Sequence, residues 1–240
     1  MKRTLIVGYV LALALFLFGQ RHPDASSPAE FHAVVDLTHS MGPQALRYKP
    51  SKLMSSELFG TRIDAPAHFA HGLWTVDQIP TDRLIAPLVV LDVSANVKGR
   101  ADYQISVDDI AQWEQAHNQI PLGSVVIART GWDSRWQSAK SYRNVDAKGT
   151  MHFPGYSSDA AKFLIEGRDT LGLGIDTLSI DYGPSKDFPV RQYTLAHSVY
   201  QLENVANLDQ APAIGGMVVV APTKLESSAS GPVRILALVR

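Results

Sequence analysis

Six short apolar runs constrain the fold of this chain more than any other feature. They are rich in valine, isoleucine and leucine, and they cover residues 32–37, 87–93, 124–130, 171–180, 214–220 and 233–239. Proline or glycine lies near each run, and runs of this length with such boundaries are typical of buried strands. Together with a few helices, they predict a single α/β domain whose sheets do not follow a simple doubly wound pattern.

Two helices are predicted between the apolar runs. Ser106, with Asp109 three residues on, resembles a capping arrangement and predicts a helix through about residue 117. A serine at 157 or 158 is expected to cap a second helix, through about residue 167. Residues 135–152 and 182–192 are polar or contain glycine and proline, so we predict connections there that border a site.

The N-terminal end has the layout of a secretory leader. Lys2 and Arg3 precede an uncharged apolar run, and the segment 1–20 is short for a membrane span. We therefore expect an exported protein, periplasmic or secreted, with a flexible tether at 21–31 and one domain at 32–240. The alternative is an uncleaved N-terminal membrane anchor, because no clear Ala-x-Ala cleavage site follows.

Composition restricts the partners and the chemistry of the mature chain. Without Lys2 and Arg3, 20 basic residues stand against 23 acidic ones, a balance that implies no nucleic-acid partner and no anionic membrane surface. The chain contains no cysteine, which excludes disulfides, thiolate metal ligands and a cysteine nucleophile. A mature chain of about 215 residues can build one sizeable core.

The segment 57–69, ELFGTRIDAPAHF, has the layout of a metal-binding strand that lacks most of its histidines. In an extended segment, side chains at alternate positions share a face, and this face presents Leu58, Arg62 and Asp64. Pro66 ends the strand and turns the chain, which leaves His68 free to lean back toward Asp64. Asp64 and His68 hold a cation only with ligands from elsewhere in the chain.

This segment resembles the signature of the metal-dependent cyclase family, which includes kynurenine formamidases and isatin hydrolases. The signature reads His-x-Gly-Thr-His-x-Asp-x-Pro-x-His, and the matching residues are Gly60, Thr61, Asp64, Pro66 and His68. Leu58 and Arg62 stand where the family has its two histidine ligands. Further similarity follows in the family's order, in VVDLTHSM, IARTGWDSRW, HFPGYSSDAA, GIDTLSID and LENVANLD.

The resemblance implies a swivelling β/β/α fold, a homo-oligomer and a small-molecule substrate. In the family, a Zn²⁺ or Mn²⁺ ion polarises a carbonyl and activates water for amide or lactone hydrolysis. The remaining family ligands are a histidine and, twelve residues later, a glutamate, and these positions hold Arg191 and Glu203. Three histidine ligands are therefore replaced, and the residual metal positions are Asp64, His68 and Glu203. By resemblance, His68 moves the proton.

The replacements suggest that guanidinium groups stand in for the metal. Without a dication, Asp64 and Glu203 would repel each other in a poorly solvated pocket. Arg62 and Arg191 can meet carboxylates through paired hydrogen bonds, although neither can ligate a metal, because a guanidinium has no free lone pair. Leu58 would fill the remaining space. The alternative is that both arginines point into solvent.

Three functions follow from these alternatives. In the first, a metal-free hydrolase, cyclase or lyase uses His68 as acid or base, and Arg62 or Arg191 stabilises an oxyanion or a substrate carboxylate. In the second, the pocket binds a small carboxylated or cyclic molecule without catalysis. In the third, a metal-dependent hydrolase holds Zn²⁺ or Mn²⁺ with the reduced set Asp64, His68 and Glu203. The first two need no cofactor.

Three aromatic residues and two aspartates near the matched segments have two interpretations. Trp132, Trp136 and Phe153 are predicted to line an apolar slot for an aromatic or cyclic substrate, and the alternative is that they fill the core. Asp176 and Asp181 are expected to cap or brace loops at the end of a strand. No Ser/His/Asp nucleophile set can be assembled from them.

Three further histidines are candidates of lower rank. His39, at the end of an apolar run, either faces the pocket or makes a structural hydrogen bond. His197 lies between the two replaced family positions, where it supplies a new base or ligand or else packs against its neighbours. His71 follows His68 by three residues and is interpreted as a surface neighbour.

Overall fold

The computed structural model describes residues 31–39 and 60–239, and its compact unit spans His32–Val239. The predicted leader, the predicted tether up to residue 30, and Leu58 lie outside the described residues. In the part of the chain that is described, no helix is both long enough and apolar enough to cross a membrane.

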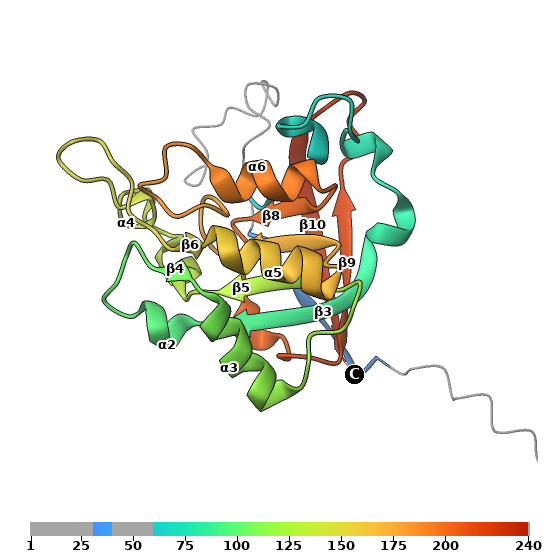
Figure 1. Cartoon of the computed structure of the whole chain (residues 1–240), viewed down its shortest axis with the longest axis horizontal. Coiled ribbons are helices and arrows are strands. Elements are labelled where there is room, and N and C mark those ends of the chain that lie inside the picture. The colour runs from blue at the N-terminus through green and yellow to red at the C-terminus, as the bar shows by residue number, and fades with distance from the viewer. Residues whose placement is uncertain (1–30, 40–59, 240) are drawn as a thin grey trace, which may run out of the picture. The chain divides into compact units, whose positions relative to one another are not determined.

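One continuous sheet organises this unit and closes on itself. Its strands are β1 (Ala33–Asp36), β2 (Arg62–Asp64), β3 (Ile85–Asp92), β5 (Val125–Arg129), β7 (Gly172–Ile175), β8 (Tyr200–Glu203), β9 (Gly216–Pro222) and β10 (Ser230–Val239). Their order is β1-β10-β2-β8-β7-β5-β3-β9, and β9 pairs with β10 as well as with β3. The result is a barrel-like arrangement in which the long strand β10 runs beside β1, β2 and β9 (Figure 1).

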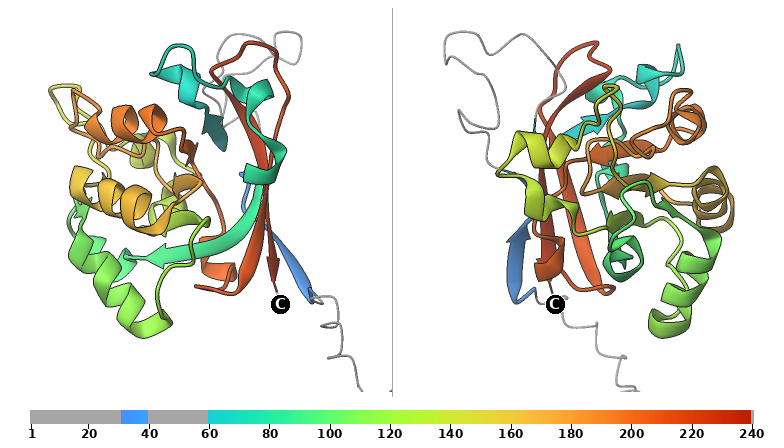
Figure 2. Two further views of the ribbon diagram at one scale, coloured as in Figure 1. Left: turned by 45° about the vertical axis from the view of Figure 1, so that its right-hand side comes forward. Right: turned by 90° about the vertical axis from the view of Figure 1, so that its left-hand side faces the viewer.

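Helices cover the outer face of the parallel part of the sheet. Strands β3, β5, β7 and β8 pair in parallel, and parallel neighbours need crossover connections, which here carry helices. The longest helices are α3 (Val107–His117), α5 (Ser158–Arg168) and α6 (Pro189–Ala196), which lie next to one another on this face (Figure 2).

Shorter elements occupy the connections. They are α2 (Ser94–Val97), α4 (Ala139–Arg143), the 3₁₀ helices η1 (Pro66–His68), η2 (Val76–Gln78), η3 (Thr81–Arg83), η4 (Trp132–Arg135) and η5 (Leu208–Gln210), and the strands β4 (Gln104–Ile105) and β6 (Gly155–Tyr156). β4 and β6 form a separate two-stranded sheet. These connections carry several of the residues that form the site.

Alternation along the parallel strands produces two hydrophobic cores. In β3, Leu88 and Val90 contribute to the core enclosed by the sheet, whereas Val89 and Leu91 contribute to the core beneath the helices. Both faces of these strands are therefore buried, which is why the sequence shows continuous apolar runs rather than alternation.

The predicted α/β fold class is confirmed, and so are both helix starts. The side chain of Ser106 accepts a hydrogen bond from the backbone N–H of Asp109, and Ser157 caps α5 in the same way. The connection predicted at 182–192 is wrong in its last part, because α6 begins at Pro189. β8 is a short buried strand without a long apolar run, and it was not predicted from the sequence.

Candidate functional site

Two neighbouring strands bring three of the predicted site residues together. β2 and β8 are antiparallel, and Arg62 lies directly opposite Glu203. Directly opposed residues share a face of the sheet, and Asp64 joins them because it is two residues along β2 from Arg62. All three are buried, and neither carboxylate residue exposes any surface.

Two guanidinium groups converge on these carboxylates. Arg62 Nη2 makes an ion pair with Glu203 Oε2, and Arg191 Nη2 lies 2.6 Å from Glu203 Oε1. Asp64 completes the arrangement, since its Oδ1 lies 3.7 Å from Arg62 Nε and its Oδ2 lies 3.8 Å from Arg191 Nη2. We refer to Arg62, Asp64, Arg191 and Glu203 as the charge cluster. Its formal charges sum to zero.

Both arginine side chains point into the protein rather than into solvent. Their exposed fractions are 8% for Arg62 and 11% for Arg191. Burial lowers the pKa of Arg62, and the charge of the nearby Asp64 carboxylate acts in the opposite direction. A guanidinium starts from so high a pKa that it stays protonated in such a site. Of the two alternatives, arginines that face the carboxylates and arginines that point into solvent, the placement of these side chains matches the first.

The carboxylates of the cluster are held by further hydrogen bonds. Ser230 Oγ on β10 donates to Asp64 Oδ1 at 2.6 Å, and the backbone N–H of Ile180 donates to Glu203 Oε1 at 3.0 Å. Ser230 has no counterpart in the sequence analysis, because its contact with Asp64 depends on the pairing of two strands that are far apart in the chain.

The guanidinium groups are anchored in a similar way by the segment after β7. Arg62 Nη2 donates to the carbonyl of Leu178 at 3.0 Å, and Arg191 Nη2 donates to Ser179 Oγ at 2.9 Å. Among the described residues, the Nε atom of each arginine has no hydrogen-bond partner. Each guanidinium thus keeps a buried Nε–H group without a hydrogen bond in this part of the protein.

The start of α6 places Arg191. The Asp181 carboxylate accepts the backbone N–H groups of Val190 at 2.9 Å and of Arg191 at 3.0 Å, so it satisfies two free donors of the first helical turn. Pro189 is the first helical residue, a position where its missing N–H has no consequence. Burial raises the pKa of Asp181. Asp181 was expected to cap or brace a loop at the end of a strand, and the structure instead places it as the cap of helix α6.

Two phenylalanines flank Arg191 and were not identified from the sequence. The guanidinium carbon lies 5.8 Å from the Phe69 ring centroid and 5.6 Å from that of Phe188, and the two rings are 6.5 Å apart. Their residues expose 41% and 37% of their surface, which is high for large apolar side chains. We call Phe69 and Phe188 the aromatic pair. Phe69 directly follows His68, which was the available signal.

His68 lies on η1, at the side of the cluster where the aromatic pair is found. It is half-buried, and its ring centroid is 5.3 Å from that of Phe69. Its backbone N–H donates to the carbonyl of Ala65 at 2.9 Å, which fixes the turn after β2. His71 and His197 are both exposed. Of these three histidines, His68 is the one that directly precedes Phe69, whose ring lies beside the Arg191 guanidinium of the charge cluster.

The three aromatic residues predicted to line a slot fall into two groups. Trp132 and Phe153 are buried together with Tyr142, and the Trp132 indole N–H donates to the carbonyl of Tyr142 at 2.8 Å. Their placement matches the core-filling alternative. Trp136 is only partly buried and packs edge-on against Tyr142, with ring centroids 5.0 Å apart.

His39 stacks on the accessible tryptophan. Its ring lies 3.8 Å from the Trp136 ring at an interplanar angle of 7°, and its backbone N–H donates to Thr61 Oγ1 at 2.9 Å. Burial lowers the pKa of His39 to about 4, so the imidazole is neutral near pH 7. A neutral imidazole stacked on an indole resembles an extension of the aromatic surface more than a charged site residue.

Asp176 braces the turn that follows β5. Its carboxylate accepts backbone N–H groups from Thr130, Gly131 and Trp132 at 2.8 to 3.1 Å, together with the Thr130 hydroxyl at 2.6 Å. Burial raises the pKa of Asp176 to about 6, and these hydrogen bonds act against that rise. The expectation that Asp176 braces a loop is confirmed.

The residues of the charge cluster do not fit a divalent metal ion. Each oxygen of Glu203 already contacts a guanidinium, and Asp64 Oδ1 accepts from Ser230. A dication would have to displace at least one like-charged guanidinium to reach these oxygens. Over the described ranges, 31–39 and 60–239, no group of three or more histidine, aspartate or glutamate residues is arranged to hold a metal.

Comparison with known proteins supports the resemblance noted in the sequence. Residues 35–182 match the model of the Cyclase family. Isatin hydrolase from Roseibium aggregatum is 33% identical over 195 residues, which cover 78% of this chain and 73% of the relative. Kynurenine formamidase from Paracidovorax citrulli is 28% identical over 203 residues, covering 81% of this chain and 82% of the relative.

A solved structure extends the match to the fold. An isatin hydrolase bound to the product analogue thioisatinate superposes with a TM-score of 0.78 and 27% identity, covering 100% of this chain and 99% of that one. The predicted cyclase-type fold is thereby confirmed. Since the family model spans more than half of the sequence and the relatives share its architecture, the chain belongs to the Cyclase family.

Proposed function

We propose that this protein is a metal-independent hydrolase that opens a C–N or lactone bond in small cyclic or aromatic molecules. The observation that carries the proposal is the ion pairing of Arg62 and Arg191 with Glu203, where relatives of the metal-dependent type would hold an ion. The two guanidinium groups supply positive charge at the position that the family resemblance assigns to the metal.

The charge balance of the cluster favours an uncharged carbonyl substrate. The cluster is neutral overall, so it gives little attraction to a substrate that already carries a carboxylate. A carbonyl oxygen gains negative charge only as water adds to its carbon, and a guanidinium of Arg62 or Arg191 supplies the N–H donors that stabilise that charge. Reorientation of one guanidinium toward the substrate is part of this proposal.

His68 is proposed to move the proton. It takes a proton from water as the water oxygen bonds to the carbonyl carbon, and it returns that proton to the leaving nitrogen or oxygen as the C–N or C–O bond breaks. No oxidant or cofactor is needed, because the products differ from the substrate by one water. The half-buried position of His68 beside Phe69 supports this role.

The aromatic pair supports a planar substrate. Phe69 and Phe188 present exposed ring surface next to Arg191, and such surface binds flat apolar groups. The names of the relatives point to isatin and to a formamide of kynurenine as the compounds to examine first.

The experiment is a hydrolysis assay with purified, chelator-treated protein on isatin, the formamide of kynurenine and simple aromatic lactones. We expect His68→Gln to reduce turnover by about 10²- to 10⁴-fold with the fold intact. His71→Gln is the matched control, because His71 is exposed and three residues away. Full activity of His68→Gln, or strict dependence on added Zn²⁺ or Mn²⁺, would contradict the proposal.

Binding without catalysis is the second candidate function. It is favoured by the many contacts that the charge cluster already makes within the chain, which leave few donors for a transition state. Calorimetric binding of isatin by a protein that turns over none of these compounds would favour this candidate over the hydrolase.

A further inference from the structure

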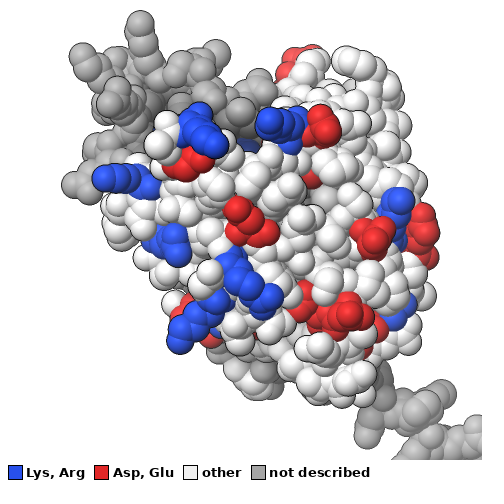
Figure 3. All heavy atoms as spheres, turned by 60° about the vertical axis from the view of Figure 1, so that its left-hand side comes forward, with Lys and Arg blue, Asp and Glu red and all other residues white. Residues whose placement is uncertain are grey.

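An open surface hollow of about 490 Å³ lies between the segment that contains α2 and the turn that leads into η4. Lys98, Arg100 and Arg135 line it, together with the polar residues Ser134 and Asn144. No carboxylate and no member of the charge cluster is among its lining residues. Figure 3 shows a face of the molecule on which lysine and arginine side chains lie among aspartate and glutamate side chains.

Aromatic rings hold two of these three cations. The Arg135 guanidinium carbon lies 3.7 Å from the Trp132 ring centroid, and that of Arg100 lies 4.5 Å from the Tyr103 ring centroid. A guanidinium stacked on a ring keeps its N–H donors at its edge, available for an acceptor. Across the described residues, none of the three cations makes an ion pair with a carboxylate.

Two carboxylates that lie close to α2 in the sequence, those of Asp92 and Asp102, are already engaged elsewhere. Asp92 pairs with Arg129 at 2.5 Å, and Asp102 contacts the His152 ring at 2.8 Å. The pKa of His152 is raised by this contact with Asp102, which favours the charged ring. These carboxylates therefore do not neutralise Lys98 and Arg100.

The carboxylates next to the aromatic rings are engaged as well. Asp109 accepts from the Tyr103 hydroxyl at 2.8 Å and from Asn96 at 2.7 Å. Asp133 accepts from the backbone N–H of Asn207, and burial raises its pKa. The hollow thus holds three positive charges that this part of the chain leaves without counter-ions.

We propose that the hollow binds a phosphate group, carried by a small organic phosphate or by a phospholipid headgroup. A phosphate accepts paired hydrogen bonds from the edge of an arginine, and a lysine adds a point charge. Asn144 also lines the hollow, and its side-chain NH₂ has a second N–H besides the one that it donates to the carbonyl of His152. This binding site is independent of the proposed hydrolysis, and its test measures binding alone.

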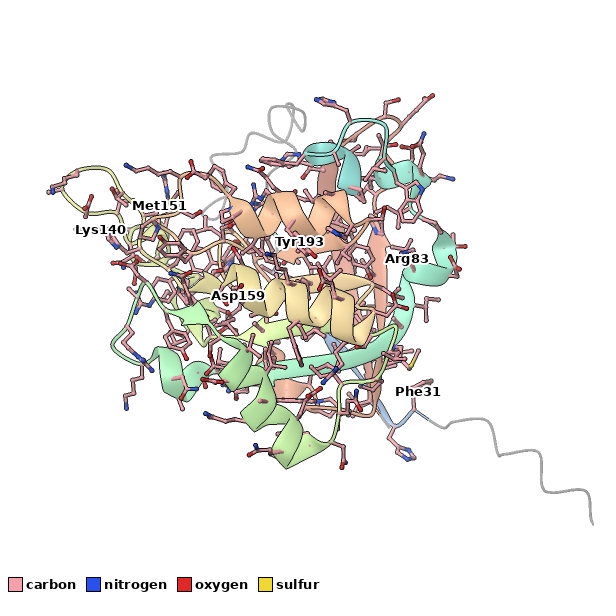
Figure 4. All side chains as sticks on the ribbon, viewed as in Figure 1. Phe31, Arg83, Lys140, Met151, Asp159 and Tyr193 are labelled. Atoms are coloured by element: carbon pink, nitrogen blue, oxygen red, sulfur yellow. The ribbon has the colours of Figure 1, made fainter. Side chains whose placement is uncertain are left out.

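The test uses the full chain and isothermal calorimetry with inorganic pyrophosphate at low ionic strength. We expect binding that the double change Arg100→Ala, Arg135→Ala weakens at least about tenfold. The matched control is Lys140→Ala, Lys148→Ala, which removes the same charge from exposed positions outside the hollow. Lys140 lies in α4, at the left of the view in Figure 4. Lys98→Ala should weaken binding further.

A second measurement distinguishes the two sources of phosphate. Sedimentation with phosphatidylcholine vesicles, with and without phosphatidylglycerol, shows whether the same arginines bind a lipid headgroup. Binding of pyrophosphate alone indicates a soluble phosphate, and binding of anionic vesicles alone indicates a lipid. The proposal is overturned if the parent binds neither probe, or if the control variant loses as much binding as the arginine variant.

Discussion

Glu203 is the residue on which the charge cluster depends. It contacts both guanidinium groups and also accepts the backbone N–H of Ile180. A buried pair of this kind adds little net stability compared with apolar residues, because desolvation offsets the attraction. Removing one partner is costly, since the other charge is then left buried and uncompensated.

The first prediction is that Arg62→Ala destabilises the protein by about 3 to 5 kcal/mol, measured by denaturant unfolding. Arg234→Ala is the matched control: Arg234 also pairs with an aspartate, but 63% of its side chain is exposed, and we expect a change of about 1 kcal/mol or less. Adding Glu203→Gln to Arg62→Ala should recover part of the loss, because it removes the unpaired charge. A loss no larger than that of Arg234→Ala would show that the pair is not buried in solution.

The sequence indicated both cluster arginines but neither phenylalanine of the aromatic pair. Arg62 and Arg191 stand at positions that a recognisable pattern assigns to ligands, so their identities alone raise the question of charge. Phe69 and Phe188 are far apart in the sequence and belong to no motif. Their proximity arises only when η1 and α6 pack together, and periodicity within one segment carries no information about such contacts.

Asp181 caps helix α6, which carries Arg191, so this buried carboxylate helps to fix the position of Arg191. The first turn of α6 has two backbone N–H groups satisfied by Asp181 rather than by a residue that directly precedes the helix. Phe188, at the N-cap, has a left-handed backbone with φ of 47°. Because this conformation is uncommon for a bulky residue, the start of α6 depends on tertiary contacts.

The second prediction is that Asp181→Asn weakens the start of α6. An amide can accept only through its oxygen, and its NH₂ faces a backbone donor, so we expect a loss of about 1 to 2 kcal/mol and faster hydrogen exchange in the first turn. Asp187→Asn is the control, because Asp187 is an exposed carboxylate before the same helix. Unchanged exchange at residues 190–192 in Asp181→Asn would contradict the assigned cap.

Elements with their own local signals were predictable, and those that depend on distant residues were not. α3 and α5 begin at serine caps that lie beside the helix in sequence. α6 follows a segment rich in polar residues and begins after a backbone conformation that no local rule favours. Pro189 was a usable signal for its first turn, but the cap itself is Asp181, eight residues before Pro189 in the chain.

At the scale of the whole molecule, the apolar runs specified the strands but not the closure of the sheet. Closure requires β9 to pair with both β3 and β10, and strand pairing is a long-range property. The pairing of β10 with β2 is also long-range, and it sets Ser230 against Asp64. The family resemblance supplied the architecture that the runs alone did not.

The third prediction tests the shared architecture through metal binding. The parent should retain well under one equivalent of Zn²⁺ or Mn²⁺. Leu58→His, Arg62→His, Arg191→His should bind a divalent ion, because it removes two guanidinium groups and supplies an imidazole at each position where the family resemblance has a histidine ligand. Calorimetry measures the affinity of each variant for the metal ion. The double variant Leu58→His, Arg62→His, which keeps Arg191, is the control. If the folded triple variant binds no better than the parent, positions 58, 62 and 191 do not surround one site.

The guanidinium groups beside Glu203 also have a consequence for how far the charge of such a site depends on the supply of metal ions. Zinc and manganese vary in supply, and a site that requires an ion can stand empty or take up the wrong one. An arginine is built into the chain at synthesis, so its charge is present in every copy and cannot be withdrawn by a competing chelator. The corresponding disadvantage is that a single delocalised charge acidifies a nearby water far less than a dication does.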